Sequence, residues 1–351
     1  MEKKSRNMAI INDSEFRSFL FLAWLLTCGV ALNAQESVVI ESKRLQTHLY
    51  ILADDSMLGR NTATVGQRKA ANYLCNQFER FSLNKILSDS NGKETWLQEF
   101  PFVKRFGDKT KYFPVSHNII GFLPGSGRLA KETLVVSAHY DHLGANDSVV
   151  FSGADDNASG TAAVLEIARV MTEKSRAKLY PNNRRNVLFI LFSGEEKGLM
   201  GSKHYAKFPV LPFKKTAANL NVDMVGRADS IHQQDSNYIY LIGSDLISPR
   251  LHEISEMAKN NCCNIALDYS YSDTAHPLRL YFRSDHYNFA KNGVPVIFYF
   301  SGLHADYHKP EDTAEKINLR ILHNRSNLVL HTAEAVMLVK RKIKRKRNAR
   351  N

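Results

Sequence analysis

SAHYDHLG (residues 137–144) and GADDNASG (residues 153–160), separated by eight residues, form the stretch on which the fold of this chain depends. The apolar run at residues 134–136 predicts a strand that ends by presenting His139 and Asp141. A loop rich in Gly and Asp follows, and the small residues after it predict a helix that approaches the sheet closely. Imidazole and carboxylate groups at a strand end, with paired aspartates just before a helix, indicate a metal site if the rest of the chain supplies further ligands.

Apolar patterns outward from this stretch predict strands that alternate with helices. The run NVLFILF at residues 186–192 is typical of a central strand covered on both faces. Helices are expected within 39–83 (broken at 54–60) and at 159–173, 246–260, 284–291 and 318–340, and strands at 96–103, 117–123, 134–139, 186–192, 218–222, 238–242 and 294–300. This order predicts an α/β fold with a mixed, mostly parallel central sheet and helices on both faces. We expect one catalytic domain at residues 35–339.

The N-terminus has the pattern of a secretory signal peptide at residues 1–34. Basic residues precede an apolar run at 19–31, and small residues lead to cleavage after Ala34. The run is shorter than the ~20 residues of a membrane span, so no transmembrane helix is expected. Thr27 before Cys28 fits a lipoprotein signal poorly, so we expect export to the periplasm or the medium without a lipid anchor.

The net charge of +12 comes mainly from the C-terminus. Residues 340–351 (KRKIKRKRNARN) hold eight Lys and Arg and no acid, and without them the net charge is about +4. Such a block is expected to be a disordered, solvated extension of the last helix with weak, incidental affinity for anions. Docking on anionic lipid or nucleic acid is the alternative, and no specific nucleic-acid site is expected.

Cysteines are few once the predicted signal peptide is removed. Cys75, Cys262 and Cys263 remain, and an odd number does not indicate a disulfide framework. Because none of them lies near the His, Asp and Glu clusters, a thiolate metal site is not expected.

Ligand-type side chains follow four of the predicted strands, and in open α/β sheets ligands bind beyond the carboxyl ends of strands. Each group alone has an ordinary explanation, such as helix capping for Asp-Asp-Asn or a solvated surface for Glu-Glu. Their coincidence at strand ends favours a metal site instead. The side chains, in chain order, are His139 and Asp141, then Asp155 and Asp156 in the loop, then Glu195 and Glu196, Asp223, and finally His304 and His308.

Imidazole and carboxylate without thiolate suit Zn²⁺ or a similar divalent ion at a catalytic site. The number of candidate ligands exceeds what one tetrahedral ion with an open position needs, whereas two ions that share a carboxylate would use the whole set. Such chemistry also needs a carboxylate free of metal to move a proton. The neighbours Glu195 and Glu196 offer one carboxylate for each task.

Several segments together resemble the co-catalytic di-zinc aminopeptidase family, which includes glutamate carboxypeptidases and glutaminyl cyclases. They are AHYDH, GADDNASG, FSGEEKGLMGS, NVDMVG, SDHYNFAKNGVPVIFYF and DYHKPEDT, in family order across residues 138–313. HLYILADDSMLGRNT and SHNIIGFLPGSG extend the match to about residue 48. The resemblance implies the zinc exopeptidase fold and two Zn²⁺ ions.

The resemblance also implies a role for each matching residue. His139 and Asp223 would bind one zinc, Glu196 and His308 the other, and Asp155 would bridge both. Glu195 would be the general base, Asp141 would orient His139, and Tyr307 would donate a hydrogen bond to the developing oxyanion, with simple aromatic packing as its alternative. His308 is preferred to His304 because it precedes the segment that ends in Asp-Thr. The family's cis peptide bond would fall at Asp155–Asp156, and His142, Asp285 and His286 are expected at most to support the ligands.

These features predict an exported metallo-exopeptidase, most simply an aminopeptidase that removes N-terminal residues from peptide substrates. One alternative on the same fold is a glutaminyl cyclase, an acyltransferase with a single zinc. Another is a catalytically inactive binding relative, although such relatives lose ligands or the base and this sequence keeps all six residues. The loops at 229–237 and 268–282 would set the substrate side-chain preference and match the family least.

Overall fold

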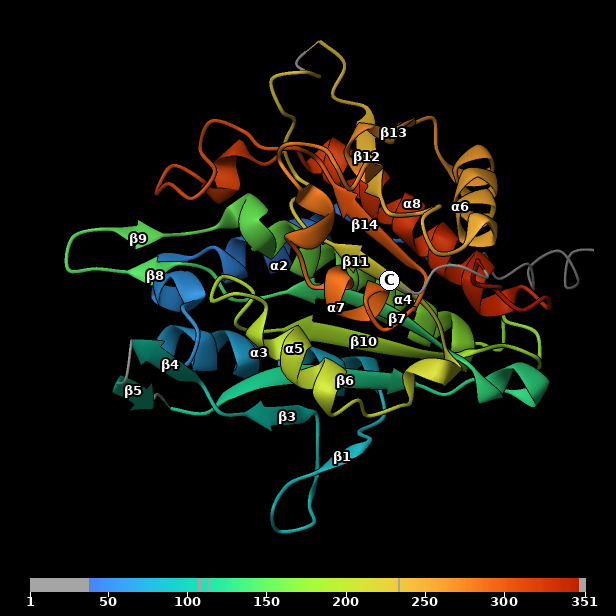
Figure 1. The fold of residues 1–351 in the computed structure, drawn as a ribbon, viewed down its shortest axis with the longest axis horizontal. Coiled ribbons are helices and arrows are strands. Elements are labelled where there is room, and N and C mark those ends of the chain that lie inside the picture. The colour runs from blue at the N-terminus through green and yellow to red at the C-terminus, as the bar shows by residue number, and fades with distance from the viewer. Residues whose placement is uncertain (1–37, 107–108, 113, 233, 347–351) are drawn as a thin grey trace, which may run out of the picture. The chain divides into compact units, whose positions relative to one another are not determined.

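An eight-stranded sheet forms the centre of the computed structural model, which describes residues 38–106, 109–112, 114–232 and 234–346 (Figure 1). Strands β10, β7, β11 and β14 are parallel neighbours, and β6 and the β12–β13 pair run antiparallel to them. The edge strand β3 is antiparallel to β6 and therefore runs in the same direction as the central four. From edge to edge the strands are β13 (Ala266–Asp268), β12 (Tyr238–Ile242), β14 (Val296–Phe300), β11 (Thr216–Val222), β7 (Thr133–His139), β10 (Asn186–Phe192), β6 (Ser116–Leu123) and β3 (Leu97–Phe100).

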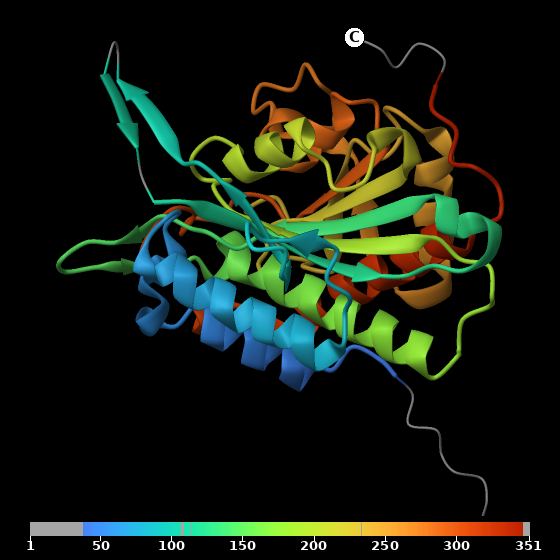
Figure 2. The same cartoon turned by 90° about the horizontal axis from the view of Figure 1, so that it is seen from below.

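Helices cover both faces of this sheet (Figure 2). They are α2 (Ser42–Leu52), α3 (Val65–Phe81), α4 (Gly160–Arg176), α5 (Met200–Lys207), α6 (Pro249–Cys262), α7 (His286–Ala290) and α8 (Leu319–Leu338). Helices α2, α3, α4 and α8 lie on one face, and α5 and α7 lie on the other (Figure 2). The predicted α/β fold with a mixed, mostly parallel sheet is confirmed.

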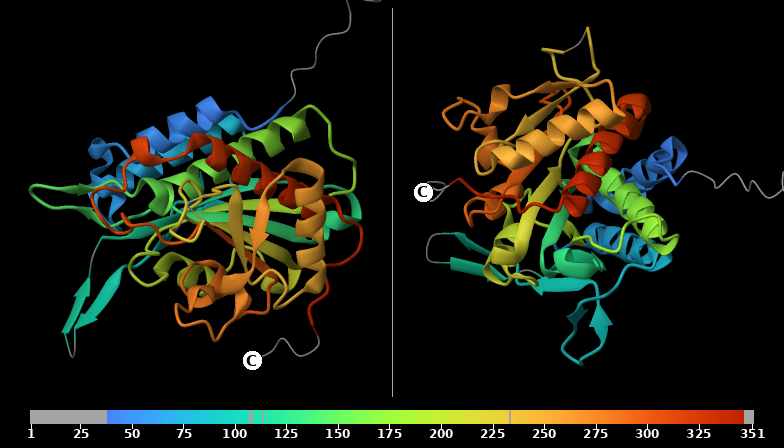
Figure 3. Two further views of the ribbon diagram at one scale, coloured as in Figure 1. Left: turned by 90° about the horizontal axis from the view of Figure 1, so that it is seen from above. Right: turned by 90° about the vertical axis from the view of Figure 1, so that its right-hand side faces the viewer.

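Three short antiparallel pairs project from the main sheet (Figures 1 and 3). They are β1 (Leu87–Ser88) with β2 (Glu94–Thr95), β4 (Val103–Phe106) with β5 (Lys109–Tyr112), and β8 (Gly144–Ala145) with β9 (Val150–Phe151). The last pair lies between the two halves of the stretch at residues 137–160.

The central strands are buried on both sides, as their continuous apolar runs predict. Every residue of β7 and of β11 is buried, and β10 is buried from Val187 to Phe192. Helix α4 can pack closely because it begins with glycine. A Cβ on Gly160 would lie 2.4 Å from the carbonyl oxygen of Val222, so only glycine allows this approach to β11.

Predicted boundaries differ from the observed ones mainly at helix ends. Helix α8 ends at Leu338 rather than at residue 340, and its N-cap Asn318 accepts hydrogen bonds from the next turn, as N-cap side chains do. Helix α5 was not predicted, since few of its side chains are buried and its apolar pattern is short. The segment at 266–268, where no strand was predicted, adds an edge strand beside β12.

The described residues from Ile40 onward form one compact unit. The predicted signal peptide at 1–34, including Cys28, lies outside the described residues. Within the described ranges, no helix combines the length and the apolar character needed to cross a bilayer. Cys262 and Cys263 form a disulfide between sequence neighbours, which leaves Cys75 as a free, half-buried thiol.

Arg325 ties α8 to the loop that follows β11. Its side chain is fully buried and donates to the carbonyl oxygens of Tyr238 (2.8 Å), Val225 (3.0 Å), Arg227 (2.6 Å) and Ser236 (3.3 Å). A buried guanidinium satisfied by four carbonyl groups fixes this loop without a carboxylate partner. Loss of the side chain would leave those carbonyl groups buried without donors.

We therefore expect Arg325→Leu to lower the free energy of unfolding by at least about 3 kcal/mol, because each buried acceptor left unpaired costs about 1–3 kcal/mol. Arg320→Leu on the exposed side of the same helix is the matched control, expected to change stability by less than about 0.5 kcal/mol. Urea denaturation followed by circular dichroism measures both values. Equal destabilisation by the two substitutions would contradict the role of Arg325.

Candidate metal centre

The register of the sheet brings the predicted ligands to one place. His139, the last residue of β7, pairs with Phe192, the last residue of β10, and Val222 of β11 pairs with Tyr299 of β14. The residues that follow these strands therefore emerge side by side at the carboxyl edge of the sheet. Ligand-type side chains were predicted to follow these four strands (β7, β10, β11 and β14), and the parallel pairing of the strands brings them close together.

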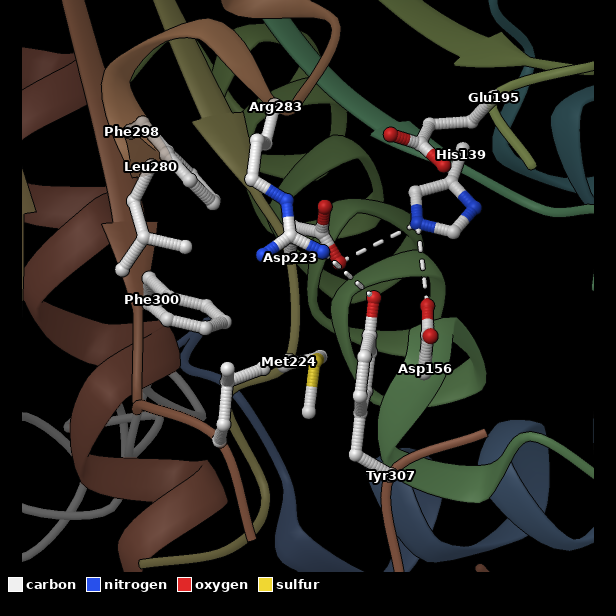
Figure 4. Close-up of a pocket in the computed structure, with 11 residues that line it drawn as sticks. His139, Asp156, Glu195, Asp223, Met224, Leu280, Arg283, Phe298, Phe300 and Tyr307 are labelled. Atoms are coloured by element: carbon white, nitrogen blue, oxygen red, sulfur yellow. Dashed lines mark hydrogen bonds and ion pairs between the residues drawn. The ribbon is translucent and has the colours of Figure 1, made fainter. Parts of the chain in front are cut away.

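One group of ligand-type atoms consists of His139, Asp156 and Asp223 (Figure 4). The His139 Nε2 atom lies 3.2 Å from Asp223 Oδ1 and 3.4 Å from Asp156 Oδ1. All three side chains are buried, and their ligand atoms lie within 4.8 Å of one another. Two carboxylates and one imidazole that converge in this way match the donor types of a zinc site.

A second group lies on the other side of the Asp156 carboxylate. The His308 Nε2 atom is 3.1 Å from Asp156 Oδ2 and 3.3 Å from Glu196 Oε2. His142 also faces this group, with its Nδ1 atom 2.9 Å from Glu196 Oε1 and 3.9 Å from Asp156 Oδ2. Sequence reasoning gave His142 at most a supporting role, yet the structure places both imidazoles beside Glu196.

The structure corrects the prediction for the neighbours Asp155 and Asp156. Asp155 was expected to bridge two metals, but its carboxylate turns away, accepts a hydrogen bond from the Gly226 backbone N–H at 2.6 Å and lies 3.5 Å from His304 Nε2. Asp156 faces both ligand groups instead, with one carboxylate oxygen toward each. The cis peptide bond likewise falls at Asp156–Asn157 rather than at Asp155–Asp156.

Asp312 explains why the two aspartates point in different directions. Its carboxylate accepts hydrogen bonds from the backbone N–H groups of both Asp155 and Asp156, at 3.0–3.1 Å. This anchor fixes the turn at Ala154–Ser159 so that consecutive side chains leave it on different sides. Sequence reasoning missed Asp312, although it lies inside the matched segment DYHKPEDT. His304 packs beside Asp155 and Asp312, away from Glu196.

Asp141 lies behind His139, as the resemblance implied, but its closest contact is through the backbone. The His139 Nδ1 atom is 3.2 Å from the Asp141 carbonyl oxygen and 3.8 Å from its carboxylate. That carboxylate accepts hydrogen bonds from Thr62 Oγ1 and from the Glu195 backbone N–H, at 2.8 and 3.2 Å. Asp141 therefore positions both the His139 ring and the loop that carries Glu195 and Glu196.

Ser284 holds the last ligand of the first group. It was predicted to cap a helix at 284–291, but α7 begins at His286 and the Ser284 hydroxyl donates to Asp223 Oδ2 at 2.8 Å. The Asn221 amide in turn donates to the Ser284 hydroxyl at 2.9 Å. Hydrogen bonds of this kind orient a metal ligand. The sequence signal for Ser284 was its place beside Asp285 in a matched segment.

A pocket opens beside the first group and is shown in Figure 4. The Glu195 side chain lines it together with His139 and Asp223 and belongs to neither ligand group. Tyr307 stacks on His308 with ring centroids 3.8 Å apart, and its hydroxyl accepts a hydrogen bond from Arg283 at 3.4 Å. Sequence reasoning missed Arg283. The opposite wall is apolar and consists of Met224, Leu280, Phe298, Phe300 and Leu303.

Carboxylates outnumber cations throughout this centre, and this imbalance shifts its pKa values. Burial raises the pKa of Glu195 well above its ordinary value, and nearby Asp223 adds to the rise. Burial alone would lower the pKa of His308, but Asp156 and Glu196 raise it to about 10. In the protein alone, the imidazolium form thus supplies positive charge that divalent ions would replace, since metal binding displaces such protons.

The residues present fit two divalent ions. Apart from their mutual contact at 2.9 Å, Glu196 Oε1 and His142 Nδ1 are buried without a hydrogen-bond partner in the described residues, and so is His142 Nε2, so polar atoms remain available on this side. Each group offers imidazole nitrogen and carboxylate oxygen, the donor types that zinc accepts. The Asp156 carboxylate is shared between the groups, which is the arrangement that two neighbouring ions require.

The chain is similar to known proteins both in sequence and in fold. The chain is 31% identical over 239 residues to "Aminopeptidase YwaD" of Bacillus subtilis, covering 66% of this chain and 46% of that protein. In fold it is similar to a solved zinc aminopeptidase from Bacillus subtilis (TM-score 0.63, 20% identity, 88% of this chain and 98% of that chain). It is also similar to Porphyromonas gingivalis glutaminyl cyclase (TM-score 0.62, 18% identity, 84% and 98%).

The chain spans about half the length of the curated relatives it matches. Residues 118–333, more than half of the chain, match the sequence family described as Peptidase family M28. These residues run from within β6 into α8 and therefore include almost all of the side chains of the centre. The chain belongs to peptidase family M28.

Proposed function

We propose that this protein is an exported metallo-exopeptidase of the aminopeptidase type, with two zinc ions held at the carboxyl edge of the sheet. The observation that carries the proposal is the Asp156 carboxylate, which presents one oxygen to His139 and Asp223 and the other to Glu196 and His308. Glu195 faces the same pocket without joining either group. Export is proposed from the signal-peptide pattern at residues 1–34.

His139, Asp223 and Asp156 would hold one ion, and Glu196, His308 and Asp156 the other. When bound, zinc would lower the pKa of a bound water and polarise the carbonyl group of the scissile bond. His142 would orient Glu196 through its Nδ1 atom rather than bind metal itself, since it lies farther from Asp156 than His308 does.

Glu195 would take the proton from the attacking water and deliver it to the leaving amine. A carboxylate suits this task when it lines the pocket, is partly shielded from solvent and is not itself a ligand. The Tyr307 hydroxyl and the Arg283 guanidinium face the same pocket and would hydrogen-bond to the substrate carbonyl oxygen as it gains negative charge. Asp141 and Ser284 would hold His139 and Asp223 in place.

The pocket also bears on the substrate. Its apolar wall of Met224, Leu280, Phe298, Phe300 and Leu303 is suited to an apolar side chain, such as that of an N-terminal leucine. An N-terminal lysine would gain no carboxylate partner on that wall and would be placed near Arg283. We therefore propose a preference for peptides that begin with an apolar residue.

Glu195→Gln should lower turnover of a leucine amide by about 10²–10⁴-fold, because general-base catalysis is worth that much. Zinc content measured by mass spectrometry should stay unchanged, since Glu195 belongs to neither ligand group. Glu94→Gln, on an exposed strand far from the site in sequence, is the matched control and should affect neither measurement. Full activity in Glu195→Gln would refute its role as the base.

A panel of aminoacyl amides tests the reaction and the side-chain preference together. The zinc-loaded protein should release leucine and phenylalanine from their amides at least about tenfold faster than lysine, as expected when an apolar pocket must accept an ammonium group. A peptide with N-terminal glutamine should be hydrolysed rather than cyclised. Cyclisation of that peptide without hydrolysis of any amide would instead favour the glutaminyl cyclase alternative.

A further inference from the structure

A second cavity, of about 470 Å³, lies at the amino end of β11, where Thr216 and Ala217 form part of its wall. Five of its lining side chains are cations: Lys214, Lys215, Lys342, Lys344 and Arg345. We call this cavity the basic pocket. The metal centre lies beyond the other end of β11, at Asp223. Because a strand of seven residues spans about 23 Å, the two sites face opposite ends of the sheet.

The basic pocket is built partly by the C-terminal segment, which the sequence alone predicted to be a disordered extension of α8. Residues 340–346 instead turn back along the end of the sheet after α8 ends (Figure 3). The Ile343 side chain is buried, with 4% of its surface exposed. The Ser248 hydroxyl donates to the Lys344 carbonyl oxygen at 2.7 Å, and the Lys346 N–H donates to Ile247 at 2.8 Å.

Arg185 fixes the start of this segment. Its buried guanidinium donates to the carbonyl oxygens of Val336 (2.9 Å) and Val339 (2.6 Å). It also forms an ion pair at 2.7 Å with Glu132, the acidic residue in the wall of the basic pocket. The one carboxylate of the wall is thus already neutralised, so it does not balance the lysines.

The lysines of the basic pocket are left without anionic partners. Lys214, Lys215, Lys342 and Lys344 form no ion pair with any carboxylate in the described residues, and all four are exposed. Like charges held around one cavity repel one another, and a multivalent anion relieves that repulsion. Lysine ammonium groups bind phosphate as point charges, without the planar geometry that arginine forks require.

We propose that the basic pocket binds the phosphate groups of anionic lipids and so docks the protein on a membrane surface. The cations come from two separate segments at one end of the fold, so they can contact several headgroups at once. No aromatic side chain lines the pocket. A stacking platform for bases is therefore missing, which disfavours single-stranded nucleic acid. In the sequence the run of basic residues continues with Arg347 and Arg350, and such basic runs are typical of segments attracted to anionic lipid.

Docking through this end would leave the metal centre facing away from the membrane, open to peptides. Ile343 is buried in the protein rather than available to insert between lipids. The attachment is therefore electrostatic and sensitive to salt, because the Debye length shortens from about 10 Å at 0.1 M to about 3 Å at 1 M ionic strength.

Sedimentation of the full chain with vesicles tests this proposal. The protein should bind phosphatidylglycerol–phosphatidylcholine vesicles at low salt, be released at about 1 M salt, and not bind pure phosphatidylcholine. Lys214→Glu with Lys215→Glu should weaken binding at least about tenfold, because each lysine near an anionic surface raises the affinity about fivefold. Lys342→Glu with Lys344→Glu should do the same from the other wall.

Lys43→Glu with Lys93→Glu makes the same change in net charge on exposed lysines outside the basic pocket, and should weaken binding far less. Hydrolysis of a leucine amide, measured in parallel, should be equal in all variants and shows that each is folded. Equal loss of vesicle binding in the control and the pocket variants would overturn the proposal. Binding confined to soluble pyrophosphate, or to duplex DNA, would overturn it as well.

Discussion

The constraint on which the centre depends is the burial of many carboxylates in one small volume. Asp141, Asp155, Asp156, Asp223, Asp285 and Asp312 are all buried, and Glu195 and Glu196 are half-buried beside them. Uncompensated charges at such depth cost several kcal/mol each. The fold meets part of this cost with hydrogen bonds from backbone N–H groups and hydroxyls. The rest calls for cations, and the two ligand groups around Asp156 are placed to hold them.

Buried arginines fix the backbone around the metal centre by donating hydrogen bonds to its carbonyl groups. The Arg60 guanidinium donates to the carbonyl oxygens of Tyr140, Ser152 and Gly153 at 2.8–2.9 Å and so links the two halves of the stretch at 137–160. Burial lowers the pKa of Arg60 to about 10, while neighbouring carboxylates oppose that change. In the same way, Arg325 donates to backbone carbonyl oxygens that include one in the loop after β11. Arg185 donates to carbonyl oxygens at the end of α8 and so fixes the start of the C-terminal segment.

Much of the fold and the centre could be predicted because strand ends follow from apolar runs. His139, Glu196, Asp223 and His308 each follow such a run, so a sheet of this order brings them together. The choice between Asp155 and Asp156 could not be predicted, because it depends on how Asp312, more than 150 residues away, anchors the turn. The family resemblance therefore assigned the bridging role to Asp155, one residue before the aspartate that faces both ligand groups. Charge alone also could not show that residues 340–346 pack against the fold.

The most direct measurement is anomalous diffraction at the zinc absorption edge from crystals of the zinc-loaded protein. The account predicts two peaks, one between His139 and Asp223 and one between Glu196 and His308, with the Asp156 carboxylate between them. Asp155 should contact neither peak. A single peak, or a peak coordinated by Asp155, would contradict the central claim that Asp156 joins two metal sites.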